Sequence, residues 1–315
     1  MSNQQDGRPA VQEGDVLWTP SAERLAASRR ADYERWLKAR DGRHFVGYED
    51  LWQWSADDLD GFWTSIWEFF DVQADGSPSP VLGERRMPGA QWFPNARLNY
   101  AEHVFRNATD ARPAIVARNE AGVREVSWRE LRDQVAALAA TFRSLGIQAG
   151  DRVASYLPNQ PETVAAFLAC ASIGATWSSC APDMGPSVVL DRLRQIEPKL
   201  LLASDSYRYN GKVHDREAVV TELLRELPCV RNVIHLPGPS AAERPVSWRD
   251  RMEWKQAVAR PADLRFERVP FDHPLWIVYS SGTTGLPKAM VFRCVSTMPP
   301  WPCTIALGRP VVPDE

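Results

Sequence analysis

The sequence predicts an α/β fold in which a mostly parallel sheet carries helices on both faces. From about residue 113, short apolar stretches typical of strands alternate with longer segments whose apolar residues recur every three or four positions. This alternation favours a parallel sheet, because neighbouring parallel strands need a crossover connection, which is usually a helix. Residues 1–110 have a different character and predict a helical, tryptophan-rich extension that precedes the sheet.

Helices are expected throughout the extension. Thr19 and Pro20 predict a helix start, because threonine caps helices well and proline is tolerated in the first turn. Ser55 is predicted to cap a second helix with a buried stripe. We interpret the aromatic residues of both helices as core rather than as a cofactor site. The stripe consists of Leu59, Phe62, Trp63, Ile66, Trp67 and Phe70.

The α/β region, residues 111–291, opens with a predicted hairpin. Residues 114–117 and 123–126 read as its strands, and Gly122 supplies the positive φ of the turn. Ser127 and Glu130 predict a capping box, and the helix that follows should end at Gly146. The remaining expected strands are 153–157, 200–203, 230–236 and 275–279, and the remaining expected helices are 163–173, 188–196 and 217–227.

Composition excludes several classes of function. The 315 residues include 37 basic and 40 acidic side chains that are interspersed, which argues against a nucleic-acid partner. The longest apolar run, residues 164–177, is too short to span a membrane, and no signal peptide is recognised, so we expect a cytoplasmic protein. Five cysteines without CxxC spacing indicate neither a disulfide framework nor a metal site.

The segment from Tyr279 to Lys288 carries the clearest chemistry. Its glycines let backbone N–H groups approach an anion, its hydroxyls can donate to phosphate oxygens, and its lysine adds positive charge. It follows an apolar strand, where α/β sheets place ligands, and it lacks the Gly-Lys-Ser/Thr of a Walker A loop. The alternative is a polar turn with an exposed lysine. The predicted phosphate-binding residues are Ser280, Ser281, Gly282, Thr283, Thr284, Gly285 and Lys288.

This ten-residue string resembles the signature of the adenylate-forming enzymes, which include the acyl-CoA synthetases. Further strings are similar to the acetoacetyl-CoA synthetase branch of that superfamily, and the resemblance runs from about residue 10 to Val291. It implies the N-terminal part of the adenylate-forming fold, with an acetyl-CoA-synthetase-like extension before it. The further strings are residues 63–71, 92–102, 177–183, 191–199 and 207–212.

The resemblance implies an acetoacetate-CoA ligase with ATP, Mg²⁺ and CoA as substrates. In that family a carboxylate attacks the α-phosphate of MgATP, and the CoA thiol then displaces AMP. The loop residues would hold the β- and γ-phosphates, and Asn210, Gly211 and Lys212 would lie near the CoA nucleotide. An ordinary surface turn is the alternative for the second group. The acid also stays open, because acetate or propionate would suit a related ligase.

The sequence departs from the family after Val291. The family's adenine-stacking motif, ribose-binding aspartate, hinge and C-terminal catalytic lysine are not recognised, so no catalytic residue is assigned, and neither Cys180 nor His273 receives a role. Residues 292–315 carry five prolines and no helix or strand period. We expect a non-family tail produced by a frameshift near codon 291, and hence a truncated, inactive and poorly soluble chain. The alternative is a non-catalytic nucleotide-binding fragment.

Overall fold

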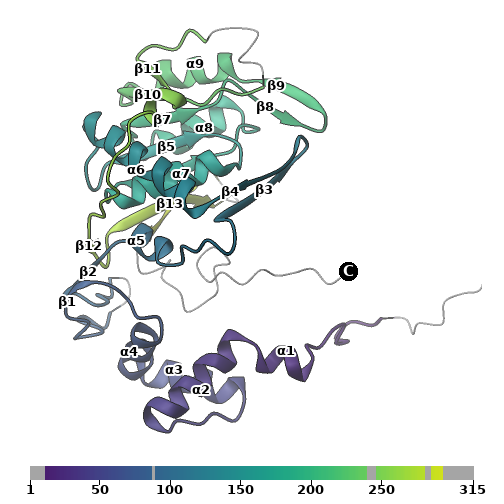
Figure 1. The fold of residues 1–315 in the computed structure, drawn as a ribbon, viewed down its shortest axis with the longest axis vertical. Coiled ribbons are helices and arrows are strands. Elements are labelled where there is room, and N and C mark those ends of the chain that lie inside the picture. The colour runs from purple at the N-terminus through teal and green to yellow at the C-terminus, as the bar shows by residue number, and fades with distance from the viewer. Residues whose placement is uncertain (1–10, 87–88, 240–245, 281–284, 294–315) are drawn as a thin grey trace, which may run out of the picture. The chain divides into compact units, whose positions relative to one another are not determined.

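The computed structural model describes residues 11–86, 89–239, 246–280 and 285–293. The chain divides into two compact units, Met1–Asp71 and Val72–Glu315. The described part of the first unit is helical, and that of the second is built around a large sheet (Figure 1). The division lies well before residue 110, the predicted end of the extension. In the described part of the chain, every helix lacks the length or the apolar character that crossing a membrane requires.

The first unit has an aromatic core. Tyr33, Leu37, Leu51 and Ile66 are buried at its centre, and seven partly buried aromatic side chains pack around them. Aromatic pairs of this kind add favourable edge-to-face contacts to the burial of their surface. Four residues of the predicted apolar stripe, Phe62, Trp63, Ile66 and Phe70, belong to this core as expected, while Leu59 and Trp67 are partly buried. The helices of this unit are α1 (Ala22–Ala26), α2 (Arg29–Asp41), α3 (Tyr48–Asp57) and α4 (Leu59–Phe69).

The predicted helix start at Thr19 and Pro20 is wrong. Ser21 caps α1 instead, since its side chain accepts a hydrogen bond from the Arg24 amide at 3.2 Å. The helix that carries Tyr33 is a separate one, α2, capped by the side chain of Ser28. Serine caps two and nine positions after the expected start therefore decide where these helices begin.

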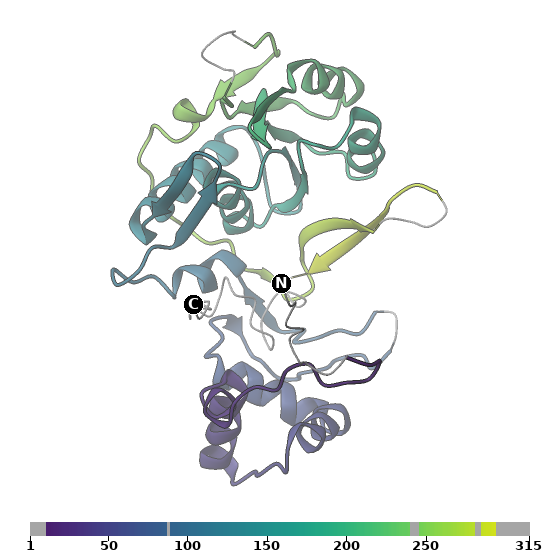
Figure 2. The same ribbon diagram turned by 90° about the vertical axis from the view of Figure 1, so that its right-hand side faces the viewer.

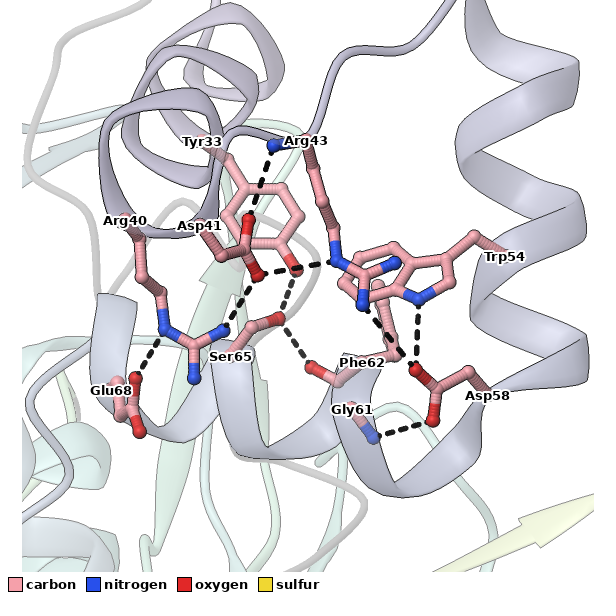
Figure 3. Close-up of polar contacts among 10 residues, drawn as sticks. All are labelled: Tyr33, Arg40, Asp41, Arg43, Trp54, Asp58, Gly61, Phe62, Ser65 and Glu68. Atoms are coloured by element: carbon pink, nitrogen blue, oxygen red, sulfur yellow. Dashed lines mark hydrogen bonds and ion pairs between the residues drawn. The ribbon is translucent and has the colours of Figure 1, made fainter.

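The predicted cap at Ser55 is also wrong. Ser55 lies inside α3, and Asp58 caps α4 by accepting from the Gly61 amide at 2.9 Å (Figure 3). The same carboxylate accepts from the indole of Trp54 at 3.1 Å, and the guanidinium of Arg43 lies 4.5 Å from the Trp54 ring. The Gly61 amide and the Trp54 indole lower the pKa of Asp58. An aspartate with two local donors outcompetes the serine as a cap.

A hydroxyl pair joins α2 to α4. The hydroxyls of Tyr33 and Ser65 lie 2.6 Å apart, and Ser65 donates to the carbonyl of Phe62 at 2.6 Å (Figure 3). Burial raises the pKa of Tyr33 to about 12, so its hydroxyl remains a donor at neutral pH. Both hydroxyl groups thereby have hydrogen-bond partners inside the core.

The second unit contains a seven-stranded sheet in the order β11-β10-β7-β5-β6-β13-β14. All neighbouring pairs are parallel except β13 and β14, which run antiparallel. The prediction of a mostly parallel sheet is confirmed. The strands are β5 (Arg152–Tyr156), β6 (Thr176–Cys180), β7 (Leu200–Ala203), β10 (Asn232–His235), β11 (Arg251–Glu253), β13 (Pro274–Ser280) and β14 (Lys288–Arg293).

Helices cover both faces of this sheet. Leu201 and Ala203 share a core cluster with residues of α8 and α9, whereas Leu200 and Leu202 are equally buried and alternate onto the opposite face. On that opposite face, Phe167 of α7 packs 6.2 Å from the ring of Trp177, and α7 also packs on α6. The covering helices are α6 (Trp128–Ser144), α7 (Pro161–Ser172), α8 (Pro186–Leu193) and α9 (Glu217–Glu226).

Smaller elements complete the described part of the unit. The hairpin and the capping box of Ser127 and Glu130 are both confirmed, and Gly122 has φ +132° at the predicted turn. The hairpin strands are β3 (Ile115–Asn119) and β4 (Gly122–Val126), and β1 (Asp75–Gly76), β2 (Ala96–Leu98) and β12 (Val269–Pro270) form a small sheet. The short helices are α5 (Tyr100–Phe105) and α10 (Trp254–Ala257).

Regular structure continues two residues beyond Val291. Phe292 and Arg293 belong to β14, because the pairing with β13 runs on to Trp276 and Pro274. The expectation that no strand follows Val291 is thus wrong for these two residues. Residues 294–315 lie outside the described residues, so the predicted tail stays a prediction.

Candidate phosphate-binding site

The signature loop joins the carboxyl end of β13 to the start of β14. Ser280 and Lys288 face each other across this hairpin as paired residues. Gly285 has φ +127°, a backbone conformation that side-chain-bearing residues rarely adopt. The structure therefore brings the first and last predicted phosphate-binding residues together. The other four, Ser281, Gly282, Thr283 and Thr284, lie outside the described residues.

The strands β13 and β14, which the loop connects, extend past the rest of the sheet (Figure 2). β13 pairs with β6 only at Trp276 and Ile277. From Val278 onward its paired neighbour is β14 alone. The carboxyl ends of parallel strands are where open α/β sheets place ligands, and the loop leaves β13 at that end.

Tyr279 attaches the base of the loop to the end of α8. Its hydroxyl donates to the carbonyl of Arg192 at 2.7 Å, and the guanidinium of Arg192 lies 5.6 Å from its ring. Burial raises the pKa of Tyr279 to about 12, so this donor persists at neutral pH. Tyr279 thus connects the carboxyl end of β13 to the end of α8.

Gln195, just after α8, contacts the other end of the loop. Its side-chain nitrogen donates to the carbonyl of Pro287 at 2.9 Å and to that of Asp191 at 2.7 Å. Residues 191–199 carry part of the family resemblance, which assigns no role to Gln195. The only local signal is its spacing from Asp191, which places the two one helical turn apart.

Cys180 and His273 have structural roles. Cys180 is fully buried, and burial raises the pKa of its thiol, which opposes formation of a thiolate nucleophile. The ring nitrogen of His273 lies 2.7 Å from the carbonyl of Gly174. A contact with a backbone carbonyl is the ordinary role that the sequence suggested for this histidine.

The predicted CoA contacts form the tip of a second hairpin. Asn210 and Gly211 both have positive φ, 51° and 71°, in the two-residue turn between β8 (Ser206–Tyr209) and β9 (Lys212–Asp215). Lys212 is exposed, and the Gly211 amide donates to the Glu120 carboxylate at 2.9 Å. This bridge joins the tips of two hairpins, β3–β4 and β8–β9. The turn chemistry explains Asn210 and Gly211 without a ligand.

The two predicted groups originate from different strands of the sheet. The β8–β9 hairpin follows β7, the phosphate loop follows β13, and β5 and β6 lie between those strands. Near the β8–β9 hairpin, Tyr207 stacks on His214 with ring centres 5.0 Å apart, and Arg216 lies 5.0 Å from the Tyr207 ring. The hairpin base therefore presents stacked rings and a cation.

A buried histidine between two carboxylates was not foreseen. One ring nitrogen of His235 lies 3.0 Å from Asp205, and the other lies 2.8 Å from Glu253. The ring of Trp248 packs edge-on at 5.0 Å. The cluster connects β10 to β11 and to the segment after β7. Asp205 and Glu253 lie 30 and 18 positions from His235 in the sequence, so no local sequence pattern indicates the cluster.

Among the described residues, no group of three or more His, Cys, Asp or Glu side chains could hold a metal ion.

The fold and the loop define an α/β protein with a loop rich in glycine and hydroxyl residues at the carboxyl end of a sheet strand. Residues 102–296, more than half of the chain, match the model of the AMP-binding enzymes, and the chain belongs to this family. Residues 48–104 match the N-terminal region of acetyl-coenzyme A synthetases.

Several relatives of this chain are acetoacetyl-CoA synthetases. The chain is 41% identical over 288 residues to an acetoacetyl-coenzyme A synthetase of Rhizobium meliloti (strain 1021), covering 90% of this chain and 44% of that relative. It is 38% identical over 301 residues to an acetoacetyl-CoA synthetase of Danio rerio, covering 91% and 44%. The structure of acetoacetyl-CoA synthetase from Streptomyces lividans superposes with a TM-score of 0.84 at 48% identity, covering 89% and 44%. The chain thus spans less than half the length of these relatives.

Proposed function

We propose that this chain provides the triphosphate-binding part of an ATP-dependent ligase that converts acetoacetate to acetoacetyl-CoA. The observation that carries the proposal is the signature loop at the carboxyl end of β13, with Ser280 and Lys288 paired across its base. Identity of 35–41% to named acetoacetyl-CoA synthetases over most of this chain supports the choice of acid.

The proposed reaction has two steps. A carboxylate oxygen of acetoacetate attacks the α-phosphorus of MgATP, the bond to the bridging oxygen of pyrophosphate breaks, and acetoacetyl-adenylate forms. The CoA thiol then loses its proton and attacks the acyl carbonyl, and AMP leaves with the electron pair of the broken acyl–oxygen bond. Both steps depend on orienting the reactants and on neutralising phosphate charge.

In this proposal the loop neutralises the leaving pyrophosphate. The hydroxyls and amides of Ser280, Ser281, Gly282, Thr283, Thr284 and Gly285 would donate to β- and γ-phosphate oxygens, and Lys288 would add a full positive charge. Hydrogen bonds from backbone amides and charged donors to phosphate are among the strongest that proteins form. No residue of this chain is assigned to proton transfer.

The hairpin tip of Asn210, Gly211 and Lys212 is proposed to meet the nucleotide part of CoA. The exposed Lys212 supports this, together with the stacked Tyr207 and His214 at the hairpin base. An exposed cation beside stacked rings suits a phosphorylated nucleotide. Lys212→Ala in a full-length ligase should raise the KM for CoA and leave that for ATP unchanged, which steady-state kinetics would measure.

The decisive experiment is pyrophosphate exchange into ATP. Exchange driven by acetoacetate, and at least tenfold weaker with acetate or propionate, supports the proposed ligase. Equal rates with the three acids would favour a broader short-chain ligase. If isothermal titration shows that MgATP binds while no acid drives exchange, the chain is a nucleotide-binding fragment, which is the alternative function. Absence of both MgATP binding and exchange would overturn the proposal for this chain.

The domain boundaries remain part of the proposal: an extension at 1–110, a partial AMP-binding domain at 111–291 and a non-family tail at 292–315. Resequencing the gene across codon 291 tests the proposed frameshift. Recovery of a family-like continuation in another reading frame would support it, and its absence in every frame would refute it. A cytoplasmic location, testable by cell fractionation, completes the proposal.

A further inference from the structure

The phosphate-loop hairpin has a short stretch of backbone pairing with the rest of the sheet. β13 pairs with β6 only through Trp276 and Ile277, and the residues of β14 are exposed throughout. The loop therefore follows a part of the hairpin, from Val278 onward, in which β13 no longer pairs with β6. A site that must hold three phosphates in one arrangement needs further support there, because groups that are already held in place lose less conformational freedom when a ligand binds.

Residues 191–195, at the end of α8, supply that support from outside the hairpin. Tyr279, before the loop, donates to the carbonyl of Arg192 at 2.7 Å. Gln195 donates to the carbonyl of Pro287, after the loop, at 2.9 Å. One short segment thus holds both ends of the loop.

The Gln195 amide has a single satisfied orientation. Its nitrogen carries two N–H donors, and it contacts two carbonyls, those of Asp191 at 2.7 Å and Pro287 at 2.9 Å. The Asp191 contact fixes the side chain on its own segment, and the second donor is then directed at the peptide that joins Pro287 to Lys288. This peptide carries the backbone nitrogen of the predicted phosphate-binding lysine.

We propose that Gln195 is a positioning residue that holds the Pro287–Lys288 peptide in place, so that Lys288 is preorganised to bind a nucleoside triphosphate. The inference rests on the proposed function of the loop and adds a residue from a different element to it. Gln195 acts through Lys288 and does not itself contact phosphate. Preorganisation of this kind improves binding by reducing what must be ordered when the ligand arrives.

The test is MgATP binding to the whole 315-residue chain by isothermal titration. Gln195→Met keeps the length of the side chain, removes both donors and adds no charge. It should weaken MgATP binding about three- to tenfold, the value of a typical hydrogen bond. The matched control is Arg194→Ala, which removes the neighbouring ion pair with Glu226 at 2.7 Å and should leave affinity unchanged.

A double-mutant cycle separates positioning from general damage. In a Lys288→Met background, Gln195→Met should change the MgATP affinity less than about twofold, because the group through which it acts is gone. An equal loss in both backgrounds would overturn the inference, and so would an unchanged affinity in the Gln195→Met single variant. Thermal melts of every variant confirm that each is folded.

Hydrogen exchange distinguishes failure of the inference from failure of the proposed function. Without ligand, Gln195→Met should speed amide exchange in peptides covering residues 285–293 and leave β5 unchanged. If the unmodified chain does not bind MgATP but this change in exchange occurs, the proposed function is wrong. The positioning of the Pro287–Lys288 peptide by Gln195 is then still supported. If exchange in residues 285–293 is the same in both proteins, the inference is wrong whether or not MgATP binds.

Discussion

The centre and the edge of the sheet use similar apolar residues in opposite ways. All four side chains of β7, Leu200–Ala203, are fully buried, whereas in β14 Met290, Val291 and Phe292 are 43%, 50% and 37% exposed. β7 has strands on both sides and helices on both faces, but β14 has one paired neighbour, β13. Apolar sequence thus becomes core only where neighbouring elements are present to cover it.

Because of this difference in burial, the centre of the sheet and its edge should contribute differently to stability and to binding. Buried strands supply most of the free energy of folding, while loops supported at a sheet edge contribute little to it and carry ligands. The candidate phosphate site lies on the hairpin of β13 and β14, away from the central core. Stability and binding should therefore respond to different substitutions.

The largest expected effect is on stability at the centre. Leu201→Ala would leave a cavity in the core beside α8 and α9 and should lower the free energy of unfolding by about 2–5 kcal/mol. The matched change at the edge, Val291→Ala, should cost about 0.5 kcal/mol or less. Urea unfolding of both variants measures the difference. Equal losses would show that the edge is covered in solution.

The second prediction concerns a substitution at the edge of the sheet that should affect MgATP binding much more than stability. Lys288→Met should weaken MgATP binding roughly ten- to a hundredfold, because a charged donor to phosphate is lost. The melting temperature should hardly change, since Lys288 is exposed. Titration calorimetry and thermal melts check the two parts. A large fall in melting temperature would mean that the hairpin end is part of the folding core.

A pH dependence of stability is expected at the central strands. Burial alone would raise the pKa of Asp151, but its contacts with Lys199, at 2.6 Å, and with the Gln148 amide outweigh it and hold the pKa below 3.8. A lowered folded-state pKa contributes stability above 3.8 that is lost as the pH falls through the folded value. Because Lys199 is partly exposed, we expect about 1 kcal/mol.

Asp151→Asn tests this acid dependence. The variant should be less stable than the parent at pH 7, and the difference should shrink toward pH 3 in urea unfolding. Arg225→Gln, which removes an exposed ion pair with Glu226, is the control and should leave the pH profile unchanged. A constant difference for Asp151→Asn at every pH would contradict the assignment.

The smallest effect on stability, under about 0.5 kcal/mol, is expected for Val291→Lys. A charge on an exposed edge strand discourages pairing with other chains, so this variant should aggregate less. Light scattering against concentration measures it, with Val116→Lys on the exposed β3 strand as the control. Similar gains from both variants would show that general charge matters more than the β14 edge.

Local patterns predicted well what neighbours in the sequence decide. The capping box of Ser127 and Glu130, the hairpin turn at Gly122 and the loop after an apolar strand depend on short spacings. The helix starts predicted at Thr19 and Ser55 are wrong because several nearby side chains compete to cap the same helix. Asn210 and Gly211 form a hairpin turn, which was the alternative to a CoA contact, while their ligand role stays a prediction.

Contacts between distant residues could not be predicted. Gln195 lies 92 positions from Pro287, and His235 lies 30 positions from Asp205. Such pairs form because crossover helices bring separate strands together, and a single sequence holds no periodic trace of them. The carboxyl end of β13 could therefore be anticipated as the place of the site, but its supports could not.

The long separation between β6 and β13 has a consequence for synthesis on the ribosome. Strands β5, β6, β7, β10 and β11 all lie within residues 152–253, whereas Ser178 of β6 meets Ile277 of β13 across 99 positions. Chains emerge from their N-terminus, and contacts between nearby segments form sooner than distant ones. The centre of the sheet should thus be assembled while β13 is still being translated, and the hairpin that carries the candidate phosphate site would join a surface that already exists.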